Sequence, residues 1–171
     1  NFPPCQGGRA ETRRPLPMGT GKTGRYLNTV GCHTQASEYA VVHSNEGTFI
    51  KSGKRHDKLR LKGGCHGQDG MDLLDKYQIE YHITHTYKNG VRIGNVPWHK
   101  HPDKRKGSNQ SWFPKSWTAT TIKKAGEHVA KLKKNANPKG GATIYGRYKG
   151  VKVGVIMTNG KIGTIFPDKN Q

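Results

Sequence analysis

The chain has 171 residues, with 30 Lys and Arg against 11 Asp and Glu, and its formal net charge is +19 at pH 7. This length suits one compact domain or two small lobes, and no run of about 18 apolar residues could span a bilayer. The excess of positive charge predicts a polyanionic partner, and it favours nucleic acid over a membrane surface because the basic residues do not oppose a continuous apolar stripe.

The N-terminal segment, up to about residue 30, is rich in Gly, Pro and Arg, which predicts a loop-rich lead-in. The chain begins at Asn1 without an initiator Met or a signal peptide, so we expect a piece of a longer protein. Residues 19–23 (GTGKT) resemble a phosphate loop but lack its first glycine and a preceding strand. The cysteines (Cys5, Cys32 and Cys65) show no CxxC spacing, so we expect structural roles rather than a zinc site.

The middle of the chain contains short apolar runs separated by turn residues. Residues 40–42 and 48–50 predict two strands around a Ser-Asn-Glu-Gly turn, and residues 69–77 predict a short helix. Residues 79–87 and 91–96 alternate on either side of Lys88-Asn89-Gly90, which predicts a hairpin with a type I′ turn.

Residues 97–117 form a loop dense in charged and aromatic side chains, and the strongest helix follows it, capped by Ser116 or Thr118. Strands are predicted over 143–148, 151–157 and 161–166, joined into a meander by Lys-Gly and Asn-Gly turns. The fold class is therefore α+β, with an antiparallel sheet packed on a main helix.

The chemistry that this surface could support depends on histidine rather than on carboxylates. The eleven acids are dispersed and form no cluster that would hold Mg²⁺ or Mn²⁺, so we expect no metal and no cofactor. Metal-free RNA cleavage needs a base for the 2′-OH, an acid for the leaving 5′-oxygen and a cation for the phosphorus. Histidine can fill both proton roles, and the chain has nine.

Three histidines have informative neighbours. His66 follows two glycines that allow a close backbone approach and precedes a helix. His56 lies in a basic stretch, and His99 lies in the loop where Trp98 could stack on a base and Lys104 and Lys106 could hold phosphates. From spacing alone, each of the three fits a catalyst and a plain RNA contact equally well. We expect surface or packing roles for five others (His33, His43, His82, His85 and His128).

An ordered set of motifs resembles the EndoU ribonuclease family, which includes the coronavirus uridylate-specific endoribonuclease and toxin domains of bacterial contact-dependent growth inhibition. These motifs are the Gly-Gly-Cys-His segment before a helix, a Trp-Phe-Pro-x-Ser-Trp segment leading into a helix, and a terminal Gly-Thr-Ile-Phe-Pro strand. The resemblance is closest to the bacterial toxins. It implies an EndoU-like nuclease domain over residues 51–171, after an N-terminal loop-rich segment over residues 1–50.

The resemblance also implies site residues, because family members use two histidines, a lysine and a late Thr or Ser near the substrate base. His66 matches one histidine and Thr164 matches the late Thr, whereas His56 and His99 are alternatives for the second histidine. Phe166 stands where relatives often have Tyr, so it can stack on a base but cannot donate a hydrogen bond. Many bacterial members have Lys at the position of Gln110, and here Lys106 is the first choice, before Lys104 and Lys115.

The resemblance implies cleavage by 2′-OH attack, which leaves a 2′,3′-cyclic phosphate, and tRNA is the expected substrate. It further implies a monomeric toxin that is delivered from the cell surface as part of a larger protein into the cytoplasm of a neighbouring bacterium. An acidic immunity protein would protect the producer. The alternatives are a non-catalytic RNA-binding module and a metal-dependent nuclease, which EDTA would stop.

Overall fold

The computed structural model describes residues 34–54 and 57–171. It is an α+β fold with three small antiparallel sheets, as the sequence predicted. Some of the residues and segments singled out above lie outside the described residues: Cys5, Cys32, His33, His56 and the segments 1–30 and 19–23. No helix within the described ranges is long and apolar enough to cross a membrane. The domain division at residue 50 stays a prediction.

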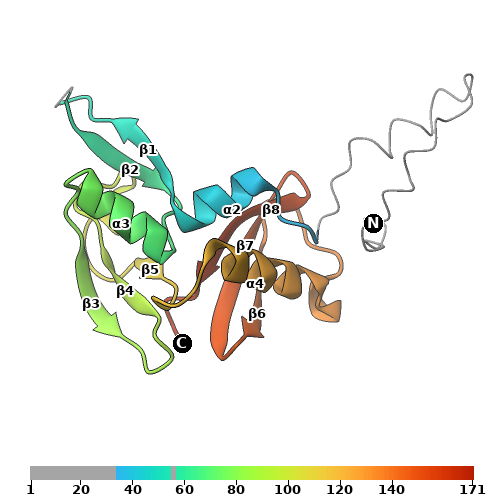
Figure 1. Ribbon diagram of the computed structural model, residues 1–171. Helices are drawn as coiled ribbons and strands as arrows, with labels where there is room; N and C mark the ends of the chain where they lie inside the picture. Colours follow the sequence, from blue (N-terminus) through green and yellow to red (C-terminus); the bar gives the residue numbers. More distant parts are fainter. Residues whose placement is uncertain (1–33, 55–56) are drawn as a thin grey trace, which may run out of the picture.

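The N-terminal lobe combines two sheets and one helix (Figure 1). Its hairpin pairs β1 (Thr48–Lys51) with β2 (Leu59–Gly63), and its second sheet has the order β3 (His82–Thr86), β4 (Arg92–Asn95) and β5 (Gln110–Trp112). The helix α3 (Gln68–Lys76) supplies Met71 and Leu74 to the core of this lobe. That core also contains Leu61, Cys65, Ile79, Val96 and Trp112.

The C-terminal lobe is a meander of β6 (Thr143–Tyr148), β7 (Val151–Thr158) and β8 (Lys161–Pro167), packed on α4 (Ala119–Lys131). Alternate residues of β7 point inward (Val153 and Val155), where they join α4 residues in the larger core. Its turns at residues 149–150 and 159–160 have positive φ at both central residues, as a type I′ turn requires. The predicted meander and main helix are therefore confirmed.

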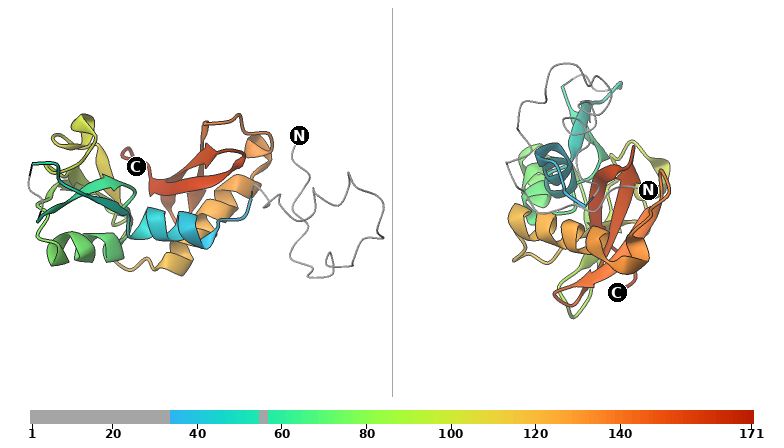
Figure 2. Two further views of the ribbon diagram at one scale, coloured as in Figure 1. Left: turned by 90° about the horizontal axis from the view of Figure 1, so that it is seen from above. Right: turned by 90° about the vertical axis from the view of Figure 1, so that its right-hand side faces the viewer.

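Helix α2 (Glu38–Asn45) joins the two lobes and corrects the strand predicted over residues 40–42. The Ser37 hydroxyl caps it by accepting a hydrogen bond from the backbone N–H of Ala40 at 3.1 Å. The helix packs against β8 and α4, far along the chain. Together α3, α2 and α4 form a row along one side of the molecule (Figure 2).

Other local predictions were wrong in detail. Strand β2 was not foreseen because it lies within a basic stretch, and β5 was not foreseen because it is short and pairs with β4 across a long loop. The turn of the β3–β4 hairpin is not type I′, since only Gly90 has a positive φ. The N–H of Gly90 donates to the carbonyl of Tyr87, and the N–H of Tyr87 donates to Val91, which is the pattern of a three-residue loop with a bulge. The 3-10 turns η2 (Pro102–Lys104) and η3 (Lys133–Asn135) complete the structure.

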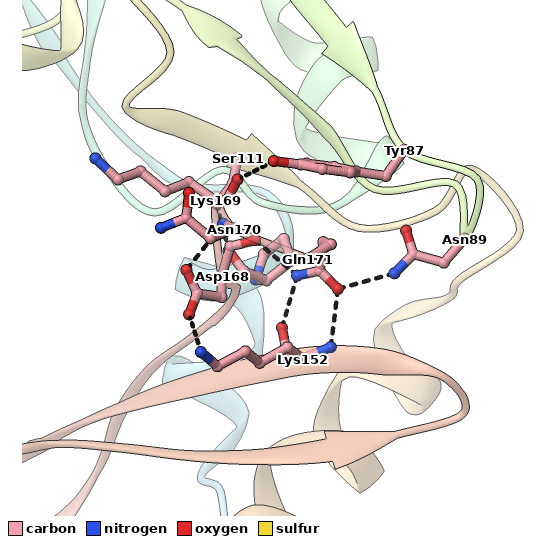
Figure 3. Close-up of polar contacts among 9 residues, drawn as sticks. Tyr87, Asn89, Ser111, Lys152, Asp168, Lys169, Asn170 and Gln171 are labelled. Carbon is pink, nitrogen blue, oxygen red and sulfur yellow. Dashed lines mark hydrogen bonds and ion pairs between the residues drawn. The ribbon is translucent and has the colours of Figure 1, made fainter.

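The last residues connect the two lobes through the side chain of Gln171 (Figure 3). Its Oε1 accepts hydrogen bonds from Asn89 Nδ2 of the hairpin loop at 2.8 Å and from the backbone N–H of Lys152 in β7 at 2.9 Å. Its Nε2 donates to the Lys152 carbonyl at 3.0 Å. The Tyr87 hydroxyl donates to the carbonyl of Lys169 at 2.7 Å. These bonds fix the end of β8 against the N-terminal lobe.

Candidate functional site

The turn after β2 is the local feature from which the site is built. Gly64 and Cys65 both have left-handed backbones, with φ of 67° and 65°. A side chain at Gly64 is impossible without rearrangement, because its Cβ would lie 1.9 Å from the His43 carbonyl oxygen. The N–H groups of Cys65 and His66 then donate to the carbonyls of His43 and Ser44, at the end of α2. The glycines thus bring the turn against α2 and fix the backbone of His66.

The ring of His66 is held in one orientation and one tautomer. Its Nδ1 lies 2.7 Å from the carbonyl oxygen of Ser111 on β5, and because a carbonyl only accepts, Nδ1 carries the proton. The residue is 4 % exposed. Nε2 is therefore the ring nitrogen that is left for the adjoining cavity. In the neutral ring this atom is a hydrogen-bond acceptor and can take a proton.

The cavity beside His66 has a volume of about 220 Å³ and lies between the two lobes. Lys104 and Asn109 line it from the N-terminal lobe. Phe166 of β8 lines it from the other lobe, with its ring centroid 5.9 Å from that of His66. The exposed faces of β6 and β7 contribute Tyr145 and Ile156.

Among the charged groups, Lys104 has the largest effect on the pKa of His66. Its Nζ lies 3.5 Å from Oε1 of the buried Gln110. The Nε2 of the same amide donates to the carbonyls of Gly64 at 3.2 Å and Cys65 at 3.0 Å. Gln110 therefore links Lys104 to the turn that carries His66.

The electrostatics around His66 and Lys104 suit an anion, and the one carboxylate that lines the cavity, Asp168, is paired with Lys152. Burial lowers the pKa of His66 to about 3, and the positive charge of Lys104 contributes to the shift. Burial also lowers the pKa of Lys104. A bound phosphate would place a negative charge next to both groups. It would raise both pKa values because it favours their protonated forms. The unliganded site therefore holds a neutral imidazole and a poorly solvated ammonium group.

His43 approaches the same turn from α2, although its sequence context suggested only a surface or packing role. Its Nδ1 lies 2.7 Å from the Thr48 hydroxyl, and its Cε1 lies 3.4 Å from where a Cβ on Gly63 would be. The ring is close enough to His66 for its charge to lower the pKa of His66. Burial and the charge of Lys62 lower the pKa of His43 itself.

The signal that could have placed His43 was the start of its helix. Ser37 followed by Glu38 is a common helix beginning, since the Ser side chain caps and the acid lies in the first turn. A strand over residues 40–42 gave no reason to place residue 43 near residue 66. Their proximity depends on the Gly63-Gly64 turn and on the packing of α2 against β8.

His99, the alternative second histidine, is sealed inside the N-terminal lobe. It is 1 % exposed, and its Nδ1 accepts a hydrogen bond from the backbone N–H of His101 at 2.9 Å. Its Nε2 is buried without a partner. Burial lowers its pKa to about 4, with Lys104 the next cause. In this conformation neither ring nitrogen is available to an RNA strand.

The other predicted residues divide between the cavity and the surface. Thr164 and Phe166 lie two residues apart in β8 and therefore point to the same face. Lys106 is exposed beyond η2, and Lys115 is exposed before α4; unlike Lys104, neither lines the cavity. Trp98 is 37 % exposed in the loop that pairs with β2, and its carbonyl accepts from the N–H of Leu61.

Across residues 34–54 and 57–171, no group of three or more His, Cys, Asp or Glu side chains is arranged to hold a metal ion. Cys65 is a buried thiol, and burial raises its pKa to about 12. It packs in the core of the N-terminal lobe, which agrees with a structural role.

Comparison with known proteins gives one match. The family model described as "Bacterial EndoU nuclease" matches residues 28–169, which is most of the chain. No curated protein and no solved structure matches the chain.

Proposed function

Since the chain belongs to the bacterial EndoU nuclease family, which implies RNA cleavage, we propose that it is a metal-independent endoribonuclease whose catalytic groups are His66, His43 and Lys104. One observation carries this assignment. His66 presents a neutral Nε2 to a cavity that Lys104 shares, and His43 lies across the same glycine turn.

The proposed reaction uses the different burial of the two histidines. The Nε2 of His66, neutral because of burial, takes the proton of the 2′-OH as the O2′–P bond forms. His43 is more exposed and is protonated more easily once the phosphate is bound, so it gives a proton to the 5′-oxygen as the P–O5′ bond breaks. Lys104 stabilises the extra charge on the phosphorane. The products are a 2′,3′-cyclic phosphate and a 5′-hydroxyl.

Substrate contacts in this proposal come from β8. Thr164 lies toward His43, and Phe166 lies beside His66. Phe166 stacks on the base or the sugar of the bound nucleotide without donating a hydrogen bond to it. Tyr145, whose ring meets that of Phe166 edge-on at 6.3 Å, continues this apolar surface.

The test is incubation of the pure protein with total tRNA and excess EDTA, with the fragment ends identified chemically. We expect fragments that end in 2′,3′-cyclic phosphate, and none from His66→Ala. Intact RNA with wild-type protein that still binds it would favour the alternative of a non-catalytic RNA-binding module. Cleavage that stops with EDTA would favour a metal-dependent nuclease.

We further propose that the chain is a toxin of interbacterial competition, delivered as part of a larger protein into the target cytoplasm, with tRNA as its substrate. The charge of +19 suits an acidic immunity protein, which the complementary potential would attract to the same surface. Expression of wild-type and His66→Ala protein inside bacteria tests this. Equal growth of the two strains, or growth arrest with intact tRNA, would contradict the toxin role or the tRNA substrate.

A further inference from the structure

A second and larger cavity lies on the other side of His43. It has a volume of about 550 Å³ and lies between the first turns of α2 and the β7–β8 hairpin. Tyr39 and His43 line it from α2, whereas Asn159, Lys161 and Thr164 line it from the hairpin and β8. The reaction proposed above uses only its inner edge, at His43 and Thr164.

This cavity borders the proposed catalytic centre at His43. His43 borders it and also influences the charge state of His66. Thr164 borders it too, and it lies on the same face of β8 as Phe166, which lines the smaller cavity. A nucleic-acid strand whose phosphate lies between His43 and His66 can therefore extend along β8 into the larger cavity.

Tyr39 provides the feature that a nucleobase would recognise. It lies one helical turn before His43, its ring is nearly parallel to that of His43 at 10°, and the ring centroids are 6.4 Å apart. The residue is 76 % exposed, the largest exposure among the exposed large hydrophobic residues of the described part. An aromatic ring held on a helix at this exposure is a stacking platform for any base.

One lysine lines this cavity, and a second lies close to His43. Lys161 is exposed on its rim at the start of β8, and Lys62 of β2 is exposed and close enough to lower the pKa of His43. Phosphates on either side of a bound nucleotide would be stabilised by these groups. The combination of an exposed ring, flanking lysines and contact with His43 fits a nucleotide better than a protein segment.

We propose that this cavity is a second nucleotide subsite, for the nucleotide next to the scissile dinucleotide, in which Tyr39 stacks on the base of that nucleotide and Lys161 holds the phosphate that joins it to the dinucleotide. The inference rests on the proposed ribonuclease function and deepens it. It predicts that cleavage depends on one nucleotide beyond the two that flank the broken bond, and that stacking makes the dependence tolerant of base identity.

The test uses short oligonucleotides with a single cleavable bond: a dinucleotide, and trinucleotides extended by one nucleotide on the 5′ or the 3′ side. For wild-type protein we expect one of the two extensions to raise kcat/KM. Tyr39→Ala should lose about 10-fold on that trinucleotide and nothing on the dinucleotide, and Tyr39→Phe should retain the gain. An abasic nucleotide at the extended position should remove the gain.

A matched control is Val42→Ala, since Val42 is also exposed on α2 but does not line the cavity. Lys161→Gln should weaken only the extended substrates, and its effect should shrink at high salt. Equal losses for Tyr39→Ala on all lengths, or no loss on any, would overturn the subsite while leaving the nuclease in place.

Failure of the proposed function gives a different result, because wild-type protein would then cleave none of the oligonucleotides. The subsite is still measured in that case by binding of 2′-deoxy trinucleotides in a fluorescence anisotropy assay. Weaker binding by Tyr39→Ala than by Tyr39→Phe supports the subsite, and identical binding by the two variants rejects it.

Discussion

His66 and His99 have closely similar surroundings and differ in one respect. Both are almost fully buried, both have a pKa lowered chiefly by burial, and Lys104 is the next cause for each. The Nδ1 of His66 donates to a carbonyl, which leaves Nε2 for the cavity. The Nδ1 of His99 accepts from a backbone N–H, and its Nε2 is enclosed. A histidine in a basic setting is therefore a candidate catalyst only when its second nitrogen can reach the substrate.

The largest effect is expected at His66 itself. Replacing it with Ala or Asn should lower kcat for RNA cleavage by about 10³-fold, within the range of lost acid–base catalysis. Asn keeps a donor toward the Ser111 carbonyl but has no atom at the position of Nε2, so it separates chemistry from folding. An active Asn variant with normal thermal stability would show that Nε2 of His66 does not take the proton.

The second-largest effect is expected at Lys104. Lys104→Ala should lower kcat by about 10²-fold, because it removes the positive charge that would stabilise the phosphate in the cavity. Lys106→Ala, two residues away and exposed, is the matched control and should change kcat less than about threefold. Steady-state cleavage of one RNA by both variants decides between them. A larger loss for Lys106→Ala than for Lys104→Ala would assign the stabilisation of the phosphorane to Lys106, the residue that the sequence favoured.

A lysine in place of Gln110 should compensate for part of the loss caused by Lys104→Ala. Its amide lies between Lys104 and the carbonyls of Gly64 and Cys65, so a lysine there could donate to the same carbonyls and restore the charge. The double variant Lys104→Ala with Gln110→Lys should therefore recover about 10-fold of the lost kcat. If the double variant is no better than Lys104→Ala, the two positions do not share a role.

The smallest effect on activity is expected at His99, where the change should appear in stability instead. Its folded pKa of about 4 is below the unfolded value of 6.5, so the unfolded chain binds the proton first. The free energy of unfolding should therefore fall as the pH decreases from 6.5 toward 4, by at most about 3 kcal/mol from this residue. His66 contributes a fall of the same sign.

The variant His99→Asn tests this, since Asn retains an acceptor for the N–H of His101 but does not titrate. Denaturant unfolding between pH 7 and pH 4 should show a shallower pH dependence than in the wild type. Cleavage at pH 7 should change by less than about threefold. A large loss of cleavage by a stably folded variant would place His99 in the catalytic machinery after all.

The sequence was informative where structure depends on neighbours along the chain. Alternation and two-residue turns predicted β6, β7 and β8, and a repeat of apolar residues three and four apart predicted α4. Helix α2 was missed because a short apolar run fits a strand as well as a helix. Strand β2 was missed because it lies within a basic stretch, and β5 was missed because a long loop separates it from its partner β4.

The candidate site residues also fall into two groups: those that belong to local sequence motifs and those that long-range packing brings to the site. His66, Thr164 and Phe166 belong to local motifs that can be seen in the sequence, and the structure places them along two adjoining cavities. His43 lacks such a motif, since its place depends on the packing of α2 and on a turn 20 residues later. The choice between Lys104 and Lys106 depends on which side chain η2 turns inward, and the spacing of lysines cannot show that.

The side-chain amide of Gln171 takes the place of a main-chain peptide group beside β7. Strand β8 ends at Pro167, and beyond it the Gln171 carboxamide forms hydrogen bonds with both the N–H and the carbonyl of Lys152, as a peptide group in a longer strand would. The same oxygen accepts from Asn89, so one amide both extends the sheet and joins it to the hairpin. The lobes therefore cannot separate at this edge without breaking those hydrogen bonds.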